Sequence, residues 1–427
     1  MISDPSLDLV EGDRIELTVG APAHGGHCVA RLDNRVFFVR HALPGERVTA
    51  EITERHKAYL RADAVEIHDA SPDRVEPPCP FAHPGGCGGC DLQHVASDAQ
   101  LRWKGDVVRE QLRRMAGLPD FPVRVEPLPT AGSRTELLGN GGLLGWRSRV
   151  RYAVDAANRP GLRKHRSHEI VPIDRCRIAH PAIQELDVLK LEWPDAAAIE
   201  ATASTGGDVA VLATPTGAGV PDDDPTGNPA PGGRQRLSGP AEVVEVAAGR
   251  EWRVPPEGFW QIHPAAAETL AATVVELLRP AEGEVAWDLY GGAGLFAAAL
   301  AIRTGARTTV VESAPLGCAA ARANLADLPT VEVVEARVET ALQRRRVAGP
   351  VDLVVLDPPR SGAGAQVVRG IAAARPRAVA YVACDPAALA RDVQTFRDLG
   401  FQLTTLRAFD CFPMTQHVEC VALLEPV

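Results

Sequence analysis

Residues 351–360 read VDLVVLDPPR, and residues 378–386 read AVAYVACDP. Each stretch begins as a short apolar run typical of a buried strand and ends in polar residues, with Asp357 in the first and Cys384 in the second. In an open parallel sheet the ligand crevice lies beyond the carboxyl ends of the strands, so we expect Asp357 and Cys384 to share a pocket. Cys384 is therefore the leading candidate for a catalytic residue.

The residues that follow Cys384 predict a helix. Asp385 is typical of an N-cap, Pro386 of the first helical position, and Gly400 of a helix stop. Because the positive end of a helix dipole favours thiolate over thiol, we expect Cys384 to ionise readily, although the carboxylate of Asp385 opposes this. The alternative is that a lone cysteine at a strand end is an inert, small apolar side chain.

The chain around these two stretches alternates strands and helices, which predicts a doubly wound, Rossmann-like α/β domain over residues 251–427. A glycine-rich turn, DLYGGAG at 288–294, follows one strand, and Glu312 ends the next, where an acid bonds ribose hydroxyls. These features indicate a nucleoside-containing cofactor, either NAD or S-adenosylmethionine. The turn lacks the G-x-G-x-x-G fingerprint of dinucleotide sites, and an acid followed by two prolines is more typical of methyltransferases.

The first part of the chain has a different pattern. Short alternating segments separated by glycine-rich or Pro-Gly turns predict five strands within residues 1–70, which suggests an OB-like β-barrel. Residues 71–250 are expected to form a central α+β domain. Within it, residues 217–239 are rich in Pro, Gly and Asp and predict a flexible surface loop.

Three cysteines lie close together in this central region, with glycines that allow a tight wrap: Cys79, Cys87 and Cys90. Cys176 is the best-placed fourth ligand. Four thiolates fit either a structural zinc ion or a 4Fe-4S cluster, and zinc is the commoner occupant. The chain has nine cysteines and no export signal, which argues for metal or catalytic use over disulfides.

The charge of the whole chain hides a local basic surface. A net charge of −10 is not typical of a nucleic-acid binder. However, a helix predicted from Ser97 or Asp98 carries basic residues on its exposed face, and residues 146–168 contain only one acid, Asp155. The basic residues are Arg102, Lys104, Arg109, Arg113 and Arg114 on the helix, Arg147, Arg149 and Arg151 at strand alternation, and then Arg159, Arg163, Lys164 and Arg166. They suit phosphate contacts, and the alternative is an ordinary solvated charged face.

The sequence also bears on location and partners. The N-terminal residues are polar and acidic, unlike a signal peptide, and no apolar run is long enough to span a membrane. We therefore expect a soluble, cytoplasmic protein with no membrane contact. Nothing in the sequence indicates an obligate protein partner.

Several motifs together resemble a known family. Residues 24–52, HGGHCVARLDNRVFFVRHALPGERVTAEI, resemble a TRAM domain, which implies RNA binding, although a bland barrel is the alternative for that segment alone. With CGGCDLQH at 87–94, GFWQIHP at 258–264, VVLDPPRSGAG at 354–364 and FPMTQHVEC at 412–420, nearly the whole chain resembles the SAM-dependent RNA uracil-C5 methyltransferases of the TrmA and RlmD type.

This resemblance implies a mechanism and a set of ligands. Cys384 would add to carbon 6 of uracil, and Glu419 would remove the carbon 5 proton, with an RNA of the transfer or ribosomal kind as substrate. The resemblance also favours a 4Fe-4S cluster over zinc at Cys79, Cys87, Cys90 and Cys176. The residues that it places around S-adenosylmethionine are Gln261, Tyr290, Gly291, Glu312 and Asp357.

The resemblance implies further that the target base is flipped out of its RNA loop before attack. Phe259 and Trp260 are candidates to stack on that base, with a place in the apolar core as the alternative for either one. Two rival functions remain. One is a methyltransferase that acts on an exocyclic amine, which would need neither Cys384 nor Glu419. The other is a noncatalytic iron-sulfur protein that binds RNA.

Overall fold

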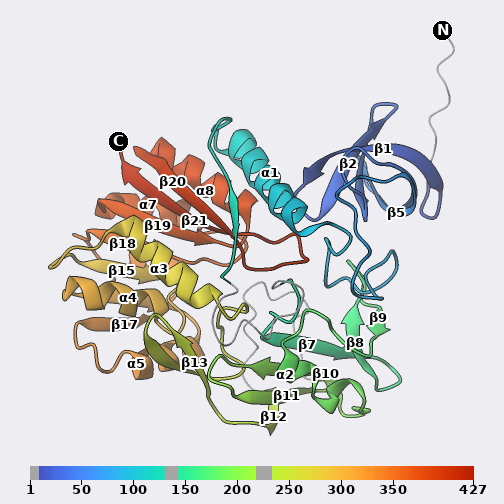
Figure 1. Cartoon of the computed structure of the whole chain (residues 1–427). Helices are drawn as coiled ribbons and strands as arrows, with labels where there is room; N and C mark the ends of the chain where they lie inside the picture. Colours follow the sequence, from blue (N-terminus) through green and yellow to red (C-terminus); the bar gives the residue numbers. More distant parts are fainter. Residues whose placement is uncertain (1–8, 130–142, 218–232) are drawn as a thin grey trace. The chain divides into compact units, whose positions relative to one another are not determined.

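The computed structural model describes residues 9–129, 143–217 and 233–427 (Figure 1). The chain divides into two compact units that interleave along the sequence. Unit 1 contains Met1–Val107, Leu162–Val171 and Met414–Gln416, and unit 2 contains Val108–Gly161, Pro172–Pro413 and His417–Val427. The boundaries at residues 70 and 250 that the sequence suggests stay predictions.

Unit 1 is built on a closed five-stranded barrel in the order β1-β2-β3-β5-β4, which confirms the predicted barrel. Its strands are β1 (Arg14–Ala23), β2 (His27–Leu32), β3 (Arg35–Arg40), β4 (Arg47–Arg55) and β5 (Leu60–Asp69). Alternate residues point inward, so that Val39, Val48 and Ile52 are almost wholly buried. The first part of α1 (Ser97–Met115) adds Trp103 to the same core.

Unit 2 contains an antiparallel sheet built on β7, β10, β11 and β12. Its bounds are β7 (Arg149–Val154), β10 (Ala196–Ala203), β11 (Val209–Pro215) and β12 (Gln235–Ser238), while β8 (Pro160–Arg163) and β9 (Ile170–Pro172) lie where the chain passes between the units. The loop predicted at 217–239 is therefore wrong for Gln235–Ser238, which pair with β11. Most of that loop, 218–232, lies outside the described residues.

Short elements connect this sheet to the rest of unit 2. They are α2 (Pro181–Gln184), a 3-10 helix (Asp187–Leu189) and the hairpin of β13 (Val243–Ala247) and β14 (Arg250–Val254). Trp252 of β14 is wholly buried in the core that also packs against the larger sheet of the unit. No helix within the described residues is apolar and long enough to cross a bilayer.

The larger sheet has eight strands in the order β17-β16-β15-β18-β19-β21-β20-β6. The strands are β15 (Ala286–Leu289), β16 (Thr308–Glu312), β17 (Val331–Glu335), β18 (Leu353–Leu356), β19 (Ala378–Ala383), β20 (Phe401–Asp410), β21 (Glu419–Pro426) and β6 (Val125–Pro127). Strands β15 to β19 are parallel, and β21 is antiparallel to β19. The doubly wound sheet is confirmed, but β6 is an addition that the sequence did not reveal.

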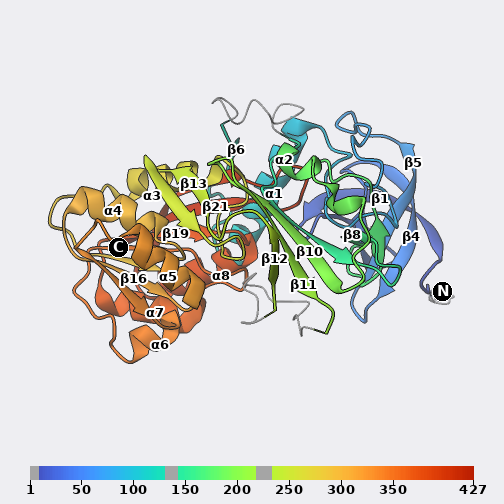
Figure 2. The same ribbon diagram turned by 90° about the horizontal axis from the view of Figure 1, so that it is seen from below.

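Helices cover both faces of this sheet (Figure 2). They are α3 (Ala266–Leu278), α4 (Leu295–Thr304), α5 (Pro315–Asn324), α6 (Val338–Gln343), α7 (Gly364–Ala374) and α8 (Pro386–Asp398). Helix α3 contacts α4, whereas α7 contacts both α6 and α8. Because the central strands are covered on both faces, every residue of β18 and β19 is buried, and polar side chains follow at their tips.

Candidate active site

Three strand ends of unit 2 bring chemically active side chains together. Asp357 directly follows β18, and Cys384 directly follows β19, the neighbouring parallel strand. In the antiparallel pair of β19 and β21, Ala383 lies opposite Cys420. One step further along this register, Cys384 faces Glu419, the first residue of β21. The site therefore gathers a thiol and two carboxyls from positions that are distant in the sequence.

The helix that follows Cys384 forms as predicted. Helix α8 begins at Pro386, and the Asp385 side chain caps it by accepting a hydrogen bond from the Ala388 N–H at 2.8 Å. Gly400 lies beyond the helix end with φ at 84°, a left-handed backbone that glycine adopts without strain. At this junction Cys384 is partly exposed.

The expectation that Cys384 ionises readily is wrong for this structure. Burial raises the pKa of its thiol far above the ordinary value, and the charges of Glu419 and Asp357 raise it further. Arg360 acts in the opposite direction with a smaller effect. The helix dipole is too weak to offset burial beside two carboxyls, because it contributes only about 0.3–1 kcal/mol at most helix ends.

Burial also governs the two carboxyls. The pKa of Glu419 is raised well above its ordinary value by burial and then by the charge of Asp357, and its residue is only 3% exposed. Burial raises the pKa of Asp357 to about 7, although a hydrogen bond from the Gln261 amide at 3.4 Å lowers it. Crowded, desolvated acids of this kind stabilise a positive charge placed among them. The site is therefore suited to a cationic ligand.

The turn after β15 has little room and a constrained backbone. Tyr290 has a φ of 63°, and its N–H donates to the Val311 carbonyl at 2.9 Å. A Cβ added at Gly291 would lie 2.6 Å from Val310 Cγ1, so only glycine fits there. The next strand ends in Glu312, whose carboxylate accepts a hydrogen bond from the Gly292 N–H at 2.9 Å. These contacts hold the turn against the end of β16.

Glu312 is also fixed by its own strand end. Its other carboxylate oxygen accepts hydrogen bonds from the N–H groups of Ser313 and Ala314, each at 2.6 Å. An acid held in this way at the second strand can still accept hydrogen bonds from ribose hydroxyls, because each carboxylate oxygen has two lone pairs. The turn after β15, which contains Tyr290 and Gly291, is thus held against the end of β16, which contains Glu312.

Asp288 begins the glycine-rich turn, and the sequence alone predicts no role for it. It is wholly buried at the end of β15, where one carboxyl oxygen accepts from the Ala297 N–H at 2.8 Å. The other oxygen has no hydrogen-bond partner among the described residues, and burial raises the pKa of Asp288 to about 8. The signal in the sequence that could have identified Asp288 is an acidic residue within an otherwise apolar strand, next to the glycine-rich turn.

A second missed group, Asp392, connects the loop after β18 to the helix after β19. Its buried carboxylate accepts hydrogen bonds from the Tyr381 hydroxyl at 2.6 Å and from the Ala363 N–H at 2.8 Å. The Gly364 N–H, at the start of α7, donates to it at 3.2 Å. Asp392 therefore positions the DPPR segment relative to Cys384. The sequence does not predict this role of Asp392, because its hydrogen bonds join α8 to the start of α7.

The two aromatic candidates for base stacking differ in exposure. Phe259 is 52% exposed, which is unusual for a phenylalanine. Trp260 packs against Trp252 with ring centroids 5.7 Å apart and belongs to the edge of the apolar core. Phe259 therefore remains available to a base, and Trp260 serves the packing of unit 2.

The predicted basic surface is only partly present. Lys104 was expected on the exposed face of α1, but it is wholly buried. Arg149 is bound within unit 2, where it donates to Glu200 at 2.6 Å and to the Gly258 carbonyl at 2.7 Å. Arg151, by contrast, is exposed. The predicted phosphate-binding face is therefore wrong for Lys104 and Arg149, because both are committed to the interior.

The predicted cluster ligands are divided between the units. Cys79, Cys87 and Cys90 belong to unit 1, and Cys176 is buried in unit 2. The Gly89 N–H donates to Cys87 Sγ at 3.4 Å, a contact of the kind that supports a thiolate ligand. Within residues 9–129, 143–217 and 233–427, no group of three or more His, Cys, Asp or Glu residues is placed to hold a metal ion. The cluster stays a prediction.

Comparison with known proteins adds an independent line of evidence. Residues 9–65 match the model of the TRAM domain, and residues 242–427 match the model of the tRNA (uracil-5-)-methyltransferase family. An uncharacterized RNA methyltransferase of Streptomyces avermitilis is 49% identical over 97% of this chain and 99% of its own. Another, from Corynebacterium efficiens, is 36% identical over 99% and 97%.

A solved structure agrees with these relatives. The tRNA (uracil-54, C5)-methyltransferase of Pyrococcus abyssi, crystallised in complex with S-adenosyl-L-homocysteine, superimposes with a TM-score of 0.70. It is 25% identical in sequence, and the match covers 96% of this chain and 100% of that one.

Proposed function

We propose that Cys384 and Glu419 carry out methyl transfer by a covalent mechanism. The chain belongs to the RNA methyltransferase family that combines a TRAM domain with a tRNA (uracil-5-)-methyltransferase domain. The family activity is SAM-dependent methylation of uracil carbon 5 in RNA. The observation that supports the mechanism is the register of β19 and β21, which sets Cys384, directly after β19, opposite the buried Glu419 at the start of β21.

The chemistry needs both groups. Carbon 5 of uracil is a weak nucleophile, so the Cys384 thiolate adds to carbon 6 and makes carbon 5 enolate-like. S-adenosylmethionine supplies the methyl group that carbon 5 then takes. The Glu419 carboxylate removes the proton that remains on carbon 5, and the electrons of that C–H bond re-form the double bond as the thiolate leaves carbon 6. The cysteine is regenerated, and 5-methyluridine is released.

The protonation states must change when the substrates bind. In the structure the pKa values of Cys384 and Glu419 are both raised, chiefly by burial. A positive charge near Asp357 would lower both, as Arg360 already does to a smaller extent. We therefore propose that the thiolate forms only in the loaded enzyme. This protects a reactive cysteine from side reactions in the free protein.

The cofactor site follows from the acids at the strand ends. We propose that Gln261, Tyr290, Gly291, Glu312 and Asp357 surround S-adenosylmethionine, with Glu312 at the ribose. The acidic surroundings suit a sulfonium cation and disfavour the pyrophosphate of a dinucleotide, which would place negative charges beside buried carboxyls. Gly291 allows the backbone to approach the ligand closely.

The substrate is proposed to be a uridine flipped out of a folded RNA. The exposed ring of Phe259, two residues before Gln261, offers a stacking surface for that base. The Pyrococcus relative acts on tRNA, which makes tRNA the first candidate and rRNA the second. We propose that the enzyme acts on this RNA in the cytoplasm.

The test is methyl transfer from labelled S-adenosylmethionine to RNA from cells that lack this protein. Wild type and Cys384→Ala are compared, followed by nucleoside analysis and mapping of the label. Label in 5-methyluridine that disappears with the alanine variant supports the proposal. Label in another nucleoside, or equal activity of the variant, contradicts it and favours an exocyclic-amine methyltransferase. RNA binding with no transfer at all favours the noncatalytic alternative.

We also propose that Cys79, Cys87 and Cys90 hold a 4Fe-4S cluster, with Cys176 as the fourth ligand. The support is the set of closely spaced thiols and the N–H contact on Cys87. Anaerobically purified protein should contain iron and acid-labile sulfide in equal amounts, and Cys87→Ser should lose both. Zinc without sulfide would instead indicate a zinc site.

A further inference from the structure

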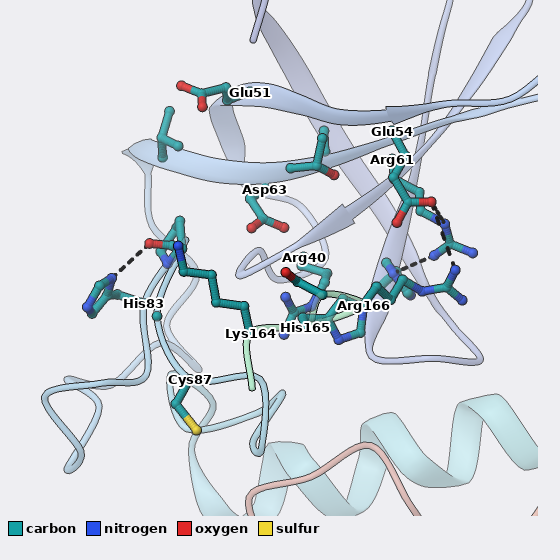
Figure 3. Close-up of a pocket in the computed structure, with 18 of the residues that line it drawn as sticks. Arg40, Glu51, Glu54, Arg61, Asp63, His83, Cys87, Lys164, His165 and Arg166 are labelled. Atoms are coloured by element: carbon teal, nitrogen blue, oxygen red, sulfur yellow. Dashed lines mark hydrogen bonds and ion pairs between the residues drawn. The ribbon is translucent and has the colours of Figure 1, made fainter. Parts of the chain in front are cut away.

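A cavity of about 530 Å³ is lined wholly by residues of unit 1 (Figure 3), whereas Cys384 belongs to unit 2. Three segments form it: strands of the barrel, the loop that carries Cys87, and the turn at 164–167. The Gly88 N–H donates to the Arg163 carbonyl at 2.9 Å and ties the loop to that turn. The volume suits a small ligand or one residue of a polymer.

Basic side chains outnumber acidic ones around this cavity. The basic ones are Arg14, Arg40, Arg61, Lys164 and Arg166, and the acids are Glu51, Glu54 and Asp63. Arg166 lies near Glu54, but at 3.9 Å the ion pair is loose. The side chain of Arg166 is 50% exposed, so it is free to turn toward a ligand. Arg14 and Arg61 pair with Glu51 and Glu54 of the lining, whereas Arg40 and Lys164 pair with Asp91 and Glu169, which lie outside it. Within the lining itself, five basic side chains accompany three acidic ones, which favours an anion.

The arrangement of these residues follows from the register of the barrel. Arg40 on β3 is paired with Asp63 on β5, and Asp63 is paired in turn with Glu51 on β4. Glu51 then pairs with Arg14 on β1, so four charged residues form one row across the strands. Arg61 lies two residues before Asp63 and therefore points to the same face. Figure 3 shows Arg61 beside Glu54, with Arg166 nearby.

Buried nitrogens on the cavity lining lack partners. Among the described residues, His27 Nδ1, Arg40 Nε and His165 Nε2 are buried and accept or donate no hydrogen bond. His27 is 3% exposed and Arg40 is 6% exposed. Because a guanidinium can only donate, the contact of 2.9 Å from Arg61 makes His27 Nε2 an acceptor. The proton of neutral His27 then lies on Nδ1, so that this nitrogen is a donor without an acceptor.

Unsatisfied buried donors are costly, and both His27 Nδ1 and Arg40 Nε belong to side chains that line this cavity. Burial, followed by the charges of Arg61 and Arg40, lowers the pKa of His27 to about 3, so that the ring is neutral near pH 7 and carries a single N–H. A phosphate offers several acceptor oxygens to such donors. The carboxylates of Glu51 and Asp63, on the same row, can accept a hydrogen bond from a ribose hydroxyl.

We propose that this cavity binds one ribonucleotide of the RNA substrate, with its phosphate on the arginine and histidine nitrogens and its 2′-hydroxyl on the carboxylates. The inference rests on the proposed function, because it assigns the nucleotide to the RNA that the strand-tip site modifies. It adds a contact on unit 1 to those of the strand-tip site on unit 2, so that unit 1 recognises RNA without reading the target base.

The test uses the full-length protein and the dinucleotide pUpU, with its 2′-deoxy counterpart, in titration calorimetry. Arg61→Gln and Arg166→Gln each remove one lining charge. Arg47→Gln is the matched control, because Arg47 is a half-exposed arginine of the same barrel, paired with Asp69 at 2.9 Å and absent from the lining. Thermal unfolding of each variant establishes that it is folded. Because the Arg166 side chain is half-exposed, we expect Arg166→Gln to fold, and this variant can test the proposal even if Arg61→Gln unfolds.

We expect Arg61→Gln to weaken pUpU binding about tenfold, Arg166→Gln to weaken it less, and Arg47→Gln to leave it unchanged. For the RNA substrate, the slope of log affinity against log salt should fall by about 0.7–0.9 with Arg61→Gln. Unchanged binding in both lining variants would overturn the inference while methyl transfer persists. Equal binding of the deoxy dinucleotide would overturn the ribose contact. Conversely, failure of uracil methylation with Arg61-sensitive pUpU binding would refute the proposed function alone.

Discussion

Replacing Glu419 by glutamine gives a sharp test of the proposed mechanism. Glutamine has nearly the same shape, so the buried packing at the start of β21 should survive, but an amide cannot take a proton from carbon 5. Addition of Cys384 to carbon 6 and methylation of carbon 5 do not require that base. We therefore expect Glu419→Gln to stop the reaction after methyl transfer, with the RNA covalently bound to Cys384.

The size of the effect follows from the position of Glu419. It faces Cys384 across the β19–β21 register and is only 3% exposed, so bulk water cannot easily replace it as a base. Loss of a positioned general base typically slows a reaction about 10²- to 10⁴-fold. That range corresponds to about 3–5 kcal/mol in the barrier to product release. If Glu419 only filled space, this isosteric change to glutamine would leave the rate of product release almost unchanged.

The assay measures two quantities in the same reaction. Release of 5-methyluridine is followed with labelled S-adenosylmethionine, and the covalent complex is detected as labelled RNA that stays with the protein under denaturing conditions. Glu419→Gln should give little release and abundant complex, and the double variant with Cys384→Ala should give neither. Release at the wild-type rate from Glu419→Gln would refute the assignment of the base.

Three further changes test the surroundings of the site. Gly291→Ala should weaken S-adenosylmethionine binding at least tenfold in calorimetry, because its Cβ would lie 2.6 Å from Val310; unchanged affinity would mean that the turn does not approach the ligand. The pKa of Asp288 is about 8 in the folded protein and 3.8 ordinarily, so the folded state binds the carboxyl proton more tightly than the unfolded state does. This tighter binding stabilises the fold fully below about pH 4, and the stabilisation is lost as the pH rises to about 8. In chemical denaturation, Asp288→Asn should therefore flatten the fall of unfolding free energy over that range by up to about 1.4 kcal/mol per pH unit, and an unchanged slope would contradict the raised pKa. Asp392→Ala should cost at least about 2 kcal/mol of unfolding free energy by leaving buried donors unpaired, whereas Asp398→Ala on the same helix should cost little.

Local signals in the sequence predicted the elements that position Cys384. Asp385, Pro386 and Gly400 mark the limits of α8 because capping and helix termination depend on a few neighbouring residues. The barrel strands and the strand-helix alternation are also local patterns. The pairing of Cys384 with Glu419 could not be derived from either residue alone, and it entered as what the family resemblance implied.

Properties that depend on tertiary surroundings were less accessible. The raised pKa of Cys384 results from burial and from acids on other strands, which a helix-dipole argument does not include. Lys104 lies in a basic helix that looks solvated in sequence, yet it is wholly buried. Arg149 binds Glu200, a residue 51 positions away, and so is not free for RNA. Each error arose where a distant segment determined the environment of a side chain.

The small strand β6 has a consequence for how the protein is made. It pairs with β20, and Arg407 on β20 binds Glu126 on β6 across a separation of 281 residues. During synthesis, residues 125–127 can therefore pair with β20 only after residues 401–410 have left the ribosome. The strand that carries Glu419 is made later still. The proposed active site is therefore complete only after β21 has been made, so a chain interrupted before Glu419 would carry the barrel of unit 1 but lack the base proposed to release the product.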